Sequence, residues 1–126
     1  MKKLITMVAL VAVLAIGVAI AQAHWVGKVI YGDGTWKVMH TGVTYAPGHI
    51  DSKQSSGPCN NWRVGLFDSG NNELWSSGVH THCPVNYTFT DTLPVLPDPY
   101  PGTTYTIKIV AAGTGQQFGY YVNERL

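Results

Sequence analysis

Short runs of alternating apolar and polar residues, each ended by Gly, Pro, Asn or Asp, dominate the chain after residue 23. No long segment there carries a helical apolar stripe free of Gly and Pro. The clearest run covers residues 104–112, where one face collects Tyr105, Ile107, Ile109 and Ala111. Because side chains alternate between the two faces of a strand, this pattern predicts an all-β sandwich or barrel with one buried face per strand.

Seven segments carry this alternation and are predicted to be strands: residues 25–31, 35–45, 62–67, 74–83, 85–91, 104–112 and 118–123. An Asp-Gly turn at residues 32–34 predicts a hairpin between the first two. Residues 46–61 are expected to be irregular, and the proline-rich residues 93–102 to cross an edge or link two sheets. Seven to eight strands in about 100 residues predict a single immunoglobulin-like (Greek-key) β-sandwich.

The first 23 residues form a separate hydrophobic block. Two lysines precede an apolar run, and Ala21-Gln22-Ala23 supplies the small residues of an Ala-x-Ala site. This layout predicts a secretory signal peptide over residues 1–23, cleaved before His24, and one exported domain over residues 24–126. The alternative is an uncleaved anchor, because about 20 apolar residues span a membrane. Contact with a membrane is expected only through this segment, and both alternatives place the domain outside the cytoplasm.

The predicted exported part is nearly neutral. The whole chain has a formal net charge of +1, and removal of the two leading lysines leaves six Lys and Arg against seven Asp and Glu. No basic field remains to hold a phosphate backbone, which argues against nucleic acid as a partner. The two cysteines, Cys59 and Cys83, are predicted to form a disulfide, because an even pair in an oxidising compartment usually does.

Residues 100–111 read Tyr-Pro-Gly-Thr-Thr-Tyr-Thr-Ile-Lys-Ile-Val-Ala. This segment resembles the Pro-Gly-Thr-x-Tyr-x-Val-x-Val-x-Ala passage of fibronectin type III domains. The resemblance implies that the segment forms the penultimate strand of the sandwich and that Tyr105 makes a corner hydrogen bond. Residues 62–112 also resemble, more loosely, the Ser/Thr-rich cell-wall domains related to yeast β-glucan assembly proteins. Both resemblances inform the fold far more than the function.

The five histidines suggest a metal site. If cleavage exposes His24, its free amine and ring nitrogen, together with the imidazole of His80 or His82, would form the three-nitrogen brace that holds copper in some exported sandwich proteins. His80 and His82 are two residues apart, so a strand would present both on one face. The alternative is that these histidines bind no cofactor. His40 and His49 are expected to have no special role.

Aromatic residues offer another binding site, since four Trp and seven Tyr are many for a domain of this size. We expect Trp62 to fill the core, and Trp75 and Tyr121 to lie exposed beside each other, where they would stack on sugars or anchor a protein. The serines and acids form no recognisable catalytic pattern. The sequence therefore predicts a non-catalytic exported module whose partner is a polysaccharide or a surface protein. Self-association through sheet edges into a fibre is a further alternative.

Overall fold

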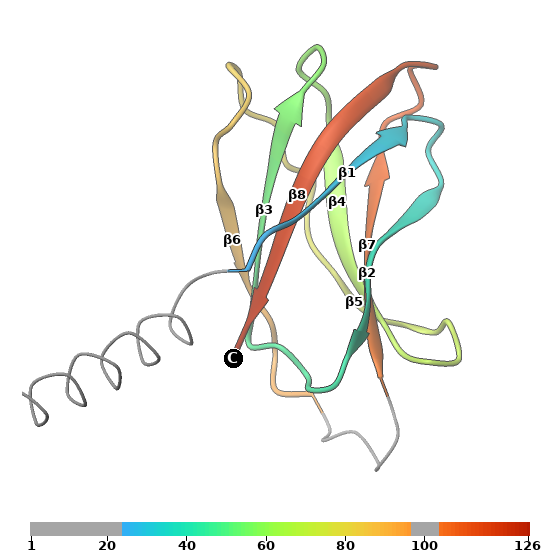
Figure 1. The fold of residues 1–126 in the computed structure, drawn as a ribbon, viewed down its shortest axis with the longest axis vertical. Coiled ribbons are helices and arrows are strands. Elements are labelled where there is room, and N and C mark those ends of the chain that lie inside the picture. The colour runs from blue at the N-terminus through green and yellow to red at the C-terminus, as the bar shows by residue number, and fades with distance from the viewer. Residues whose placement is uncertain (1–23, 97–103) are drawn as a thin grey trace, which may run out of the picture.

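The computed structural model describes residues 24–96 and 104–126, which form an all-β sandwich. Its strands are β1 (Val26–Tyr31), β2 (Trp36–Val43), β3 (His49–Ser56), β4 (Trp62–Phe67), β5 (Glu73–Ser76), β6 (Phe89–Thr92), β7 (Tyr105–Ala111) and β8 (Gln117–Arg125). The first sheet has the order β1-β8-β3-β6 and the second β2-β7-β4-β5, with antiparallel pairing throughout (Figure 1). The predicted all-β sandwich of seven to eight strands is confirmed.

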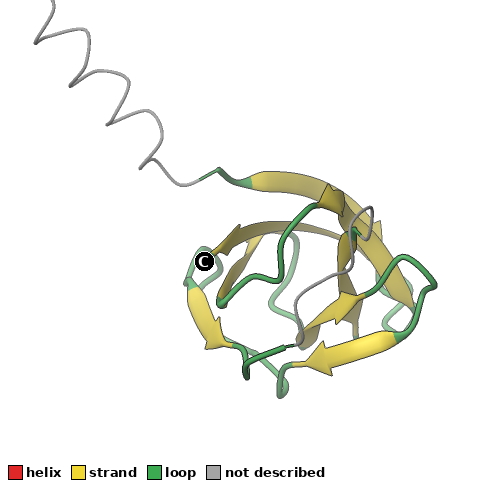
Figure 2. Ribbon diagram, turned by 90° about the horizontal axis from the view of Figure 1, so that it is seen from below, coloured by secondary structure: helices red, strands yellow, loops and turns green. Residues whose placement is uncertain are grey.

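The hydrophobic core lies between the two sheets. Figure 2, a view along the strands, shows the sheets on either side of this interior. β7 buries every second residue, as its alternation predicts: Tyr105, Ile107, Ile109 and Ala111 are all at most 3% exposed. Trp62, the predicted core tryptophan, is 2% exposed, and its indole nitrogen donates to Ser52 Oγ at 3.3 Å. The strand periodicity therefore identified the inward face of the second sheet correctly.

The turn at residues 32–34 does not form the predicted hairpin. β1 pairs with β8, and β2 pairs with β7, so the turn carries the chain from one sheet to the other. Backbone hydrogen bonds tie it to the β7–β8 loop. Of the two central residues of the expected turn, only Gly34 has a positive φ, of +77°. Asp33 accepts hydrogen bonds from the Thr35 hydroxyl, the Lys37 ammonium and the Thr35 amide, which hold its pKa at about 2.

Residues 46–61 contain an internal strand of the first sheet, where the sequence predicted an irregular connection. This strand, β3, lies between β8 and β6. Two of its inward side chains are polar, since Ser52 is fully buried and Gln54 is 1% exposed. Both have hydrogen-bond partners inside the protein, which removes the penalty of burying them. A strand that buries polar groups lacks the apolar alternation that identifies strands in a sequence.

The predicted strands at residues 74–83 and 85–91 are shorter than expected. Only Glu73–Ser76 and Phe89–Thr92 form strands there. Between them His80 makes an isolated bridge to Trp62, with reciprocal backbone hydrogen bonds of 2.8 and 3.1 Å. The segment between β5 and β6 is therefore a long loop that is fastened at one point to β4.

β8 occupies an internal position in the first sheet, between β1 and β3, and has no partner in the second sheet. In constant-type immunoglobulin domains the last strand instead lies beside the strand that precedes it. β7 is the penultimate described strand, the position that the fibronectin type III resemblance implies for it. The relation to that family stays a prediction from the sequence.

Three sequence predictions fall wholly or partly outside the described residues. They are the signal segment at residues 1–23 with its cleavage site, the end of the proline-rich segment, and the start of the fibronectin-like segment, since residues 97–103 are also not described. Within residues 24–96 and 104–126, no helix has the length and apolarity needed to cross a membrane.

Candidate ligand-binding face

Two aromatic rings and a lysine meet on the outer side of the first sheet. Lys53 lies opposite Tyr121 in the β3–β8 ladder, and both point away from the core because their neighbours Ser52 and Val122 are buried. The Lys53 ammonium lies 4.9 Å from the ring centroid of Trp25 and 5.6 Å from that of Tyr121. These are cation–π distances, so the lysine contacts both rings.

The Tyr121 ring lies across Gly27 of the neighbouring strand. Gly27 is the ladder partner of Tyr121, and a Cβ atom at this position would overlap the ring. Only glycine at position 27 therefore allows the Tyr121 ring to pack against the backbone of β1 in this position. The ring is held in place while 38% of Tyr121 stays exposed to solvent.

A shallow depression of about 360 Å³ adjoins the Tyr121 ring. A β-bulge between Gln54 and Ser56 shifts the register of β3 against β8. As a result the hydroxyls of Ser55 and Ser56, although consecutive, both lie over Gly119. The depression is lined by Gly27, Lys28, Val29, Ser55, Ser56, Gly119 and Tyr121. We call this depression, with Trp25 and Lys53 beside it, the aromatic face.

An ion pair between the buried Asp51 and the exposed Arg125 borders the aromatic face. Arg125 contacts Asp51 with both arms of its guanidinium, Nε to Oδ2 at 3.1 Å and Nη2 to Oδ1 at 3.2 Å. Asp51 also accepts hydrogen bonds from Thr90 and Asn123. Burial alone would raise the pKa of Asp51, but these hydrogen bonds and the charge of Arg125 outweigh it and lower the pKa below its ordinary value.

This depressed pKa predicts acid sensitivity. A carboxyl whose pKa is lower in the folded state stabilises the fold above its unfolded pKa of about 4, and this contribution is lost as the pH falls through the folded pKa. Asp51→Asn should therefore reduce the free energy of unfolding by about 2 kcal/mol at pH 7 and flatten its decline below pH 4. Urea unfolding between pH 2 and 7 measures both effects, with Glu73→Gln on the exposed end of β5 as the control. Equal slopes for wild type and Asp51→Asn would contradict the prediction.

The structure does not bring Trp75 and Tyr121 together. Trp75 lies on β5 in the second sheet, opposite the buried Leu66, and is partly buried against the core. Tyr121 lies on β8 in the first sheet, where its neighbour is Trp25. No sequence pattern indicates that Trp25 and Tyr121 lie near the same lysine, because Trp25 precedes the first strand and Tyr121 belongs to the last.

His24 and His80 lie on opposite sides of the first sheet. The His24 amide donates to Asn123 Oδ1 at 3.0 Å, and Asn123 is on the outer side with its ladder partner Asp51. His80 Nε2 lies 2.7 Å from Asp91 Oδ2. Asp91 faces the core, because its ladder partner Ile50 does. The sheet therefore separates the two histidines.

His82 contacts neither of them. Its ring stacks on Tyr87 with a centroid distance of 4.0 Å, and it is exposed, whereas His80 stacks on Phe89 at 4.3 Å. In the part of the chain that the structure describes, no group of three or more His, Cys, Asp or Glu side chains is arranged to hold a metal ion. The copper hypothesis thus gains no support from geometry and stays a prediction from the sequence.

His40, which the sequence suggested had no role, forms a pair across the sandwich. Its Nδ1 lies 2.7 Å from Glu124 Oε1, in a contact that lacks hydrogen-bond geometry. The Glu124 side chain is 8% exposed and points inward beside Ile50, its ladder partner. The pair joins β2 of the second sheet to β8 of the first. Neither this pair nor His80 with Asp91 lines the depression. His40 and Glu124 join two strands, whereas His80 and Asp91 join the β5–β6 loop to β6.

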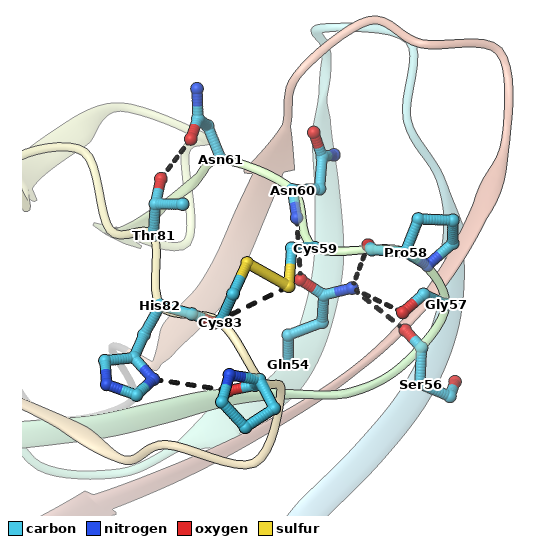
Figure 3. The surroundings of a disulfide bond; sticks show 11 residues. Gln54, Ser56, Gly57, Pro58, Cys59, Asn60, Asn61, Thr81, His82 and Cys83 are labelled. Atoms are coloured by element: carbon cyan, nitrogen blue, oxygen red, sulfur yellow. Dashed lines mark hydrogen bonds between the residues drawn. A yellow bond between two sulfur atoms is a disulfide. The ribbon is translucent and has the colours of Figure 1, made fainter.

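The predicted disulfide between Cys59 and Cys83 is present. It joins the β3–β4 loop to the loop that follows the His80 bridge (Figure 3). Disulfides persist in oxidising compartments and are rare in the cytosol. The bond therefore indicates a non-cytoplasmic, oxidising compartment for this protein.

The buried side-chain amide of Gln54 forms hydrogen bonds to the same β3–β4 loop. Gln54 Nε2 donates to the carbonyls of Ser56 at 3.0 Å and Pro58 at 2.6 Å, and its Oε1 accepts from the Asn60 amide at 3.0 Å. Figure 3 shows the Gln54 side chain reaching into this loop beside the disulfide. Ser56 borders the depression. The disulfide and Gln54 therefore stabilise the loop at one end of the aromatic face.

Comparison of the chain with known family models and with curated proteins gave no match. The geometry of the aromatic face is therefore the basis for a functional proposal.

Proposed function

We propose that this protein is a secreted, non-catalytic module that binds an extracellular polysaccharide through the aromatic face. The observation that carries the proposal is that the rings of Trp25 and Tyr121 both lie within cation–π distance of Lys53, beside a depression edged by two serine hydroxyls. The disulfide supports a location outside the cytoplasm. Secretion itself rests on the predicted signal peptide at residues 1–23.

The chemistry of the face fits a sugar. Exposed aromatic rings offer an apolar surface to the C–H face of a sugar, and the polar end of Tyr121 stays available to water or ligand. The hydroxyls of Ser55 and Ser56 both donate and accept hydrogen bonds, as sugar hydroxyls do. The depression is open and shallow, which suits contact with one part of a long chain. A small ligand is usually bound in a deeper cavity that covers most of its surface.

The alternative of fibre assembly gains no support from the first strand. β1 is hydrogen-bonded to β8 over its whole length, from Val26 to Tyr31, so it is not an unpaired strand awaiting a neighbour. Donor-strand assembly requires an open position in the sheet for the incoming strand. Polysaccharide binding is therefore the function that the geometry favours.

Removing either ring should weaken polysaccharide binding. We expect Trp25→Ala and Tyr121→Ala each to reduce affinity at least tenfold, because large aromatics near the centre of an interface contribute most of its binding energy. Isothermal titration against a panel of plant, fungal and bacterial cell-wall polysaccharides measures the effect. Tyr87→Ala is the matched control, since Tyr87 is 49% exposed but does not line the depression.

Gly27→Ala tests the same ring without deleting it. The added methyl group would displace the Tyr121 ring from the β1 backbone, so affinity should fall while the exposed aromatic surface remains. Circular dichroism verifies that each variant is folded. The proposal is wrong if the wild type binds no polysaccharide in the panel, or if the Tyr121→Ala and Gly27→Ala variants bind as tightly as the wild type.

A further inference from the structure

Lys53, which lies beside the depression of the aromatic face, is an unneutralised cation. It lies on β3, an internal strand, with its ammonium 4.9 Å and 5.6 Å from the two ring centroids. No carboxylate within residues 24–96 and 104–126 forms an ion pair with it. The rings fix the position of the charge but do not neutralise it.

None of the carboxylates on the strands of the first sheet pairs with Lys53. Its strands contain three: Asp51, Asp91 and Glu124. Asp91 and Glu124 are both ladder partners of Ile50 and therefore point toward the core side of the sheet. Asp51 is on the outer side, but Arg125 neutralises it. Lys53 consequently leaves the outer side with a local positive charge, although the domain as a whole is nearly neutral.

We infer that the ligand is an acidic polysaccharide whose carboxylate groups are bound by Lys53; this inference rests on the proposed polysaccharide-binding function. A carboxylate at the Lys53 ammonium would lie close to both Trp25 and Tyr121, so the sugar that carries it would be within reach of the rings. The serine hydroxyls next to Tyr121 would hydrogen-bond to the neutral hydroxyls of the same polysaccharide. Charge complementarity thus selects acidic chains over neutral ones of the same shape.

The direct test compares each acidic polysaccharide with its neutral counterpart. Polygalacturonate, alginate and hyaluronan are titrated into the wild-type protein, each beside the same polymer after reduction of its carboxyl groups. We expect at least one acidic polymer to bind at least tenfold more tightly than its reduced form. This preference should shrink between 50 mM and 500 mM NaCl, because salt screens an exposed charge.

Three lysine variants assign the preference to one residue. Lys53→Gln should reduce affinity for the acidic polymer at least tenfold more than it reduces affinity for the reduced form, so that the preference is lost, whereas Lys53→Arg, which keeps the charge, should retain most of the preference. Lys108→Gln is the matched control. Its ammonium lies 4.5 Å from the Phe67 ring, in the second sheet, and its replacement should change nothing.

The outcomes separate the inference from the proposed function. Equal binding of acidic and reduced polymers, together with loss of binding in Tyr121→Ala, would overturn the acidic ligand and leave the polysaccharide-binding function intact. An equal loss in Lys53→Gln and Lys108→Gln would also overturn it, since binding would then follow overall charge. Absence of binding to every polymer, charged or reduced, would overturn the function itself.

Discussion

Trp62→Ala is expected to lower the free energy of unfolding by about 4 kcal/mol, a large part of the stability of a domain of this size. Trp62 is 2% exposed and lies at the centre of an aromatic cluster. Its ring centroid is 5.4 Å from those of Phe89 and Tyr120 and 5.8 Å from that of His80. Alanine would leave a large cavity between the sheets and remove the donor to Ser52.

Chemical denaturation followed by far-ultraviolet circular dichroism measures this loss without relying on tryptophan emission. Trp75→Ala is the control, because Trp75 is only partly buried at the edge of the core and should cost clearly less. Trp62→Phe, which keeps an aromatic ring but loses the indole N–H, should lie between the two. A Trp62→Ala variant no less stable than Trp75→Ala would show that Trp62 is not the centre of this core.

Local pattern was enough to predict the fold class and several core residues. The alternation of β7 depends only on side-chain direction along one strand, so Tyr105 and Ile107 were identified as buried without knowledge of their neighbours. Cys59 and Cys83 were paired because the chain offers no other cysteine. In each case the information needed for the prediction lies in a short segment or in the count of one residue type.

The candidate site was not predictable in the same way, because it depends on contacts between distant segments. Trp25 and Tyr121 meet only because β8 pairs with β1, and the Asp-Gly turn had suggested that β1 pairs with β2 instead. Lys53 belongs to a strand whose inward residues are polar, so apolar alternation did not reveal it. The aromatic face thus combines Trp25 and Tyr121, which are far apart in the sequence, with Lys53 on β3, a strand that the sequence pattern did not predict.

Loss of the disulfide has the second largest expected effect. The double variant Cys59→Ser with Cys83→Ser should lower the free energy of unfolding by about 3 kcal/mol, because the bond closes a loop with a sequence separation of 24 and restricts the unfolded chain. Denaturation with and without a phosphine reductant measures the loss. Reductant should destabilise the wild type to the level of the variant and leave the variant unchanged. A variant as stable as the oxidised wild type would contradict the prediction.

Binding and stability should respond differently to this change. The loop at the end of the aromatic face has a second attachment, since Gln54 hydrogen-bonds to Ser56, Pro58 and Asn60 independently of the sulfur atoms. Well below its unfolding temperature the double variant should therefore bind polysaccharide as the wild type does. Gln54→Leu, which keeps the disulfide but leaves those loop groups without their partner, should lose affinity. If instead the serine variant loses affinity and Gln54→Leu does not, the disulfide and not the buried amide positions Ser56.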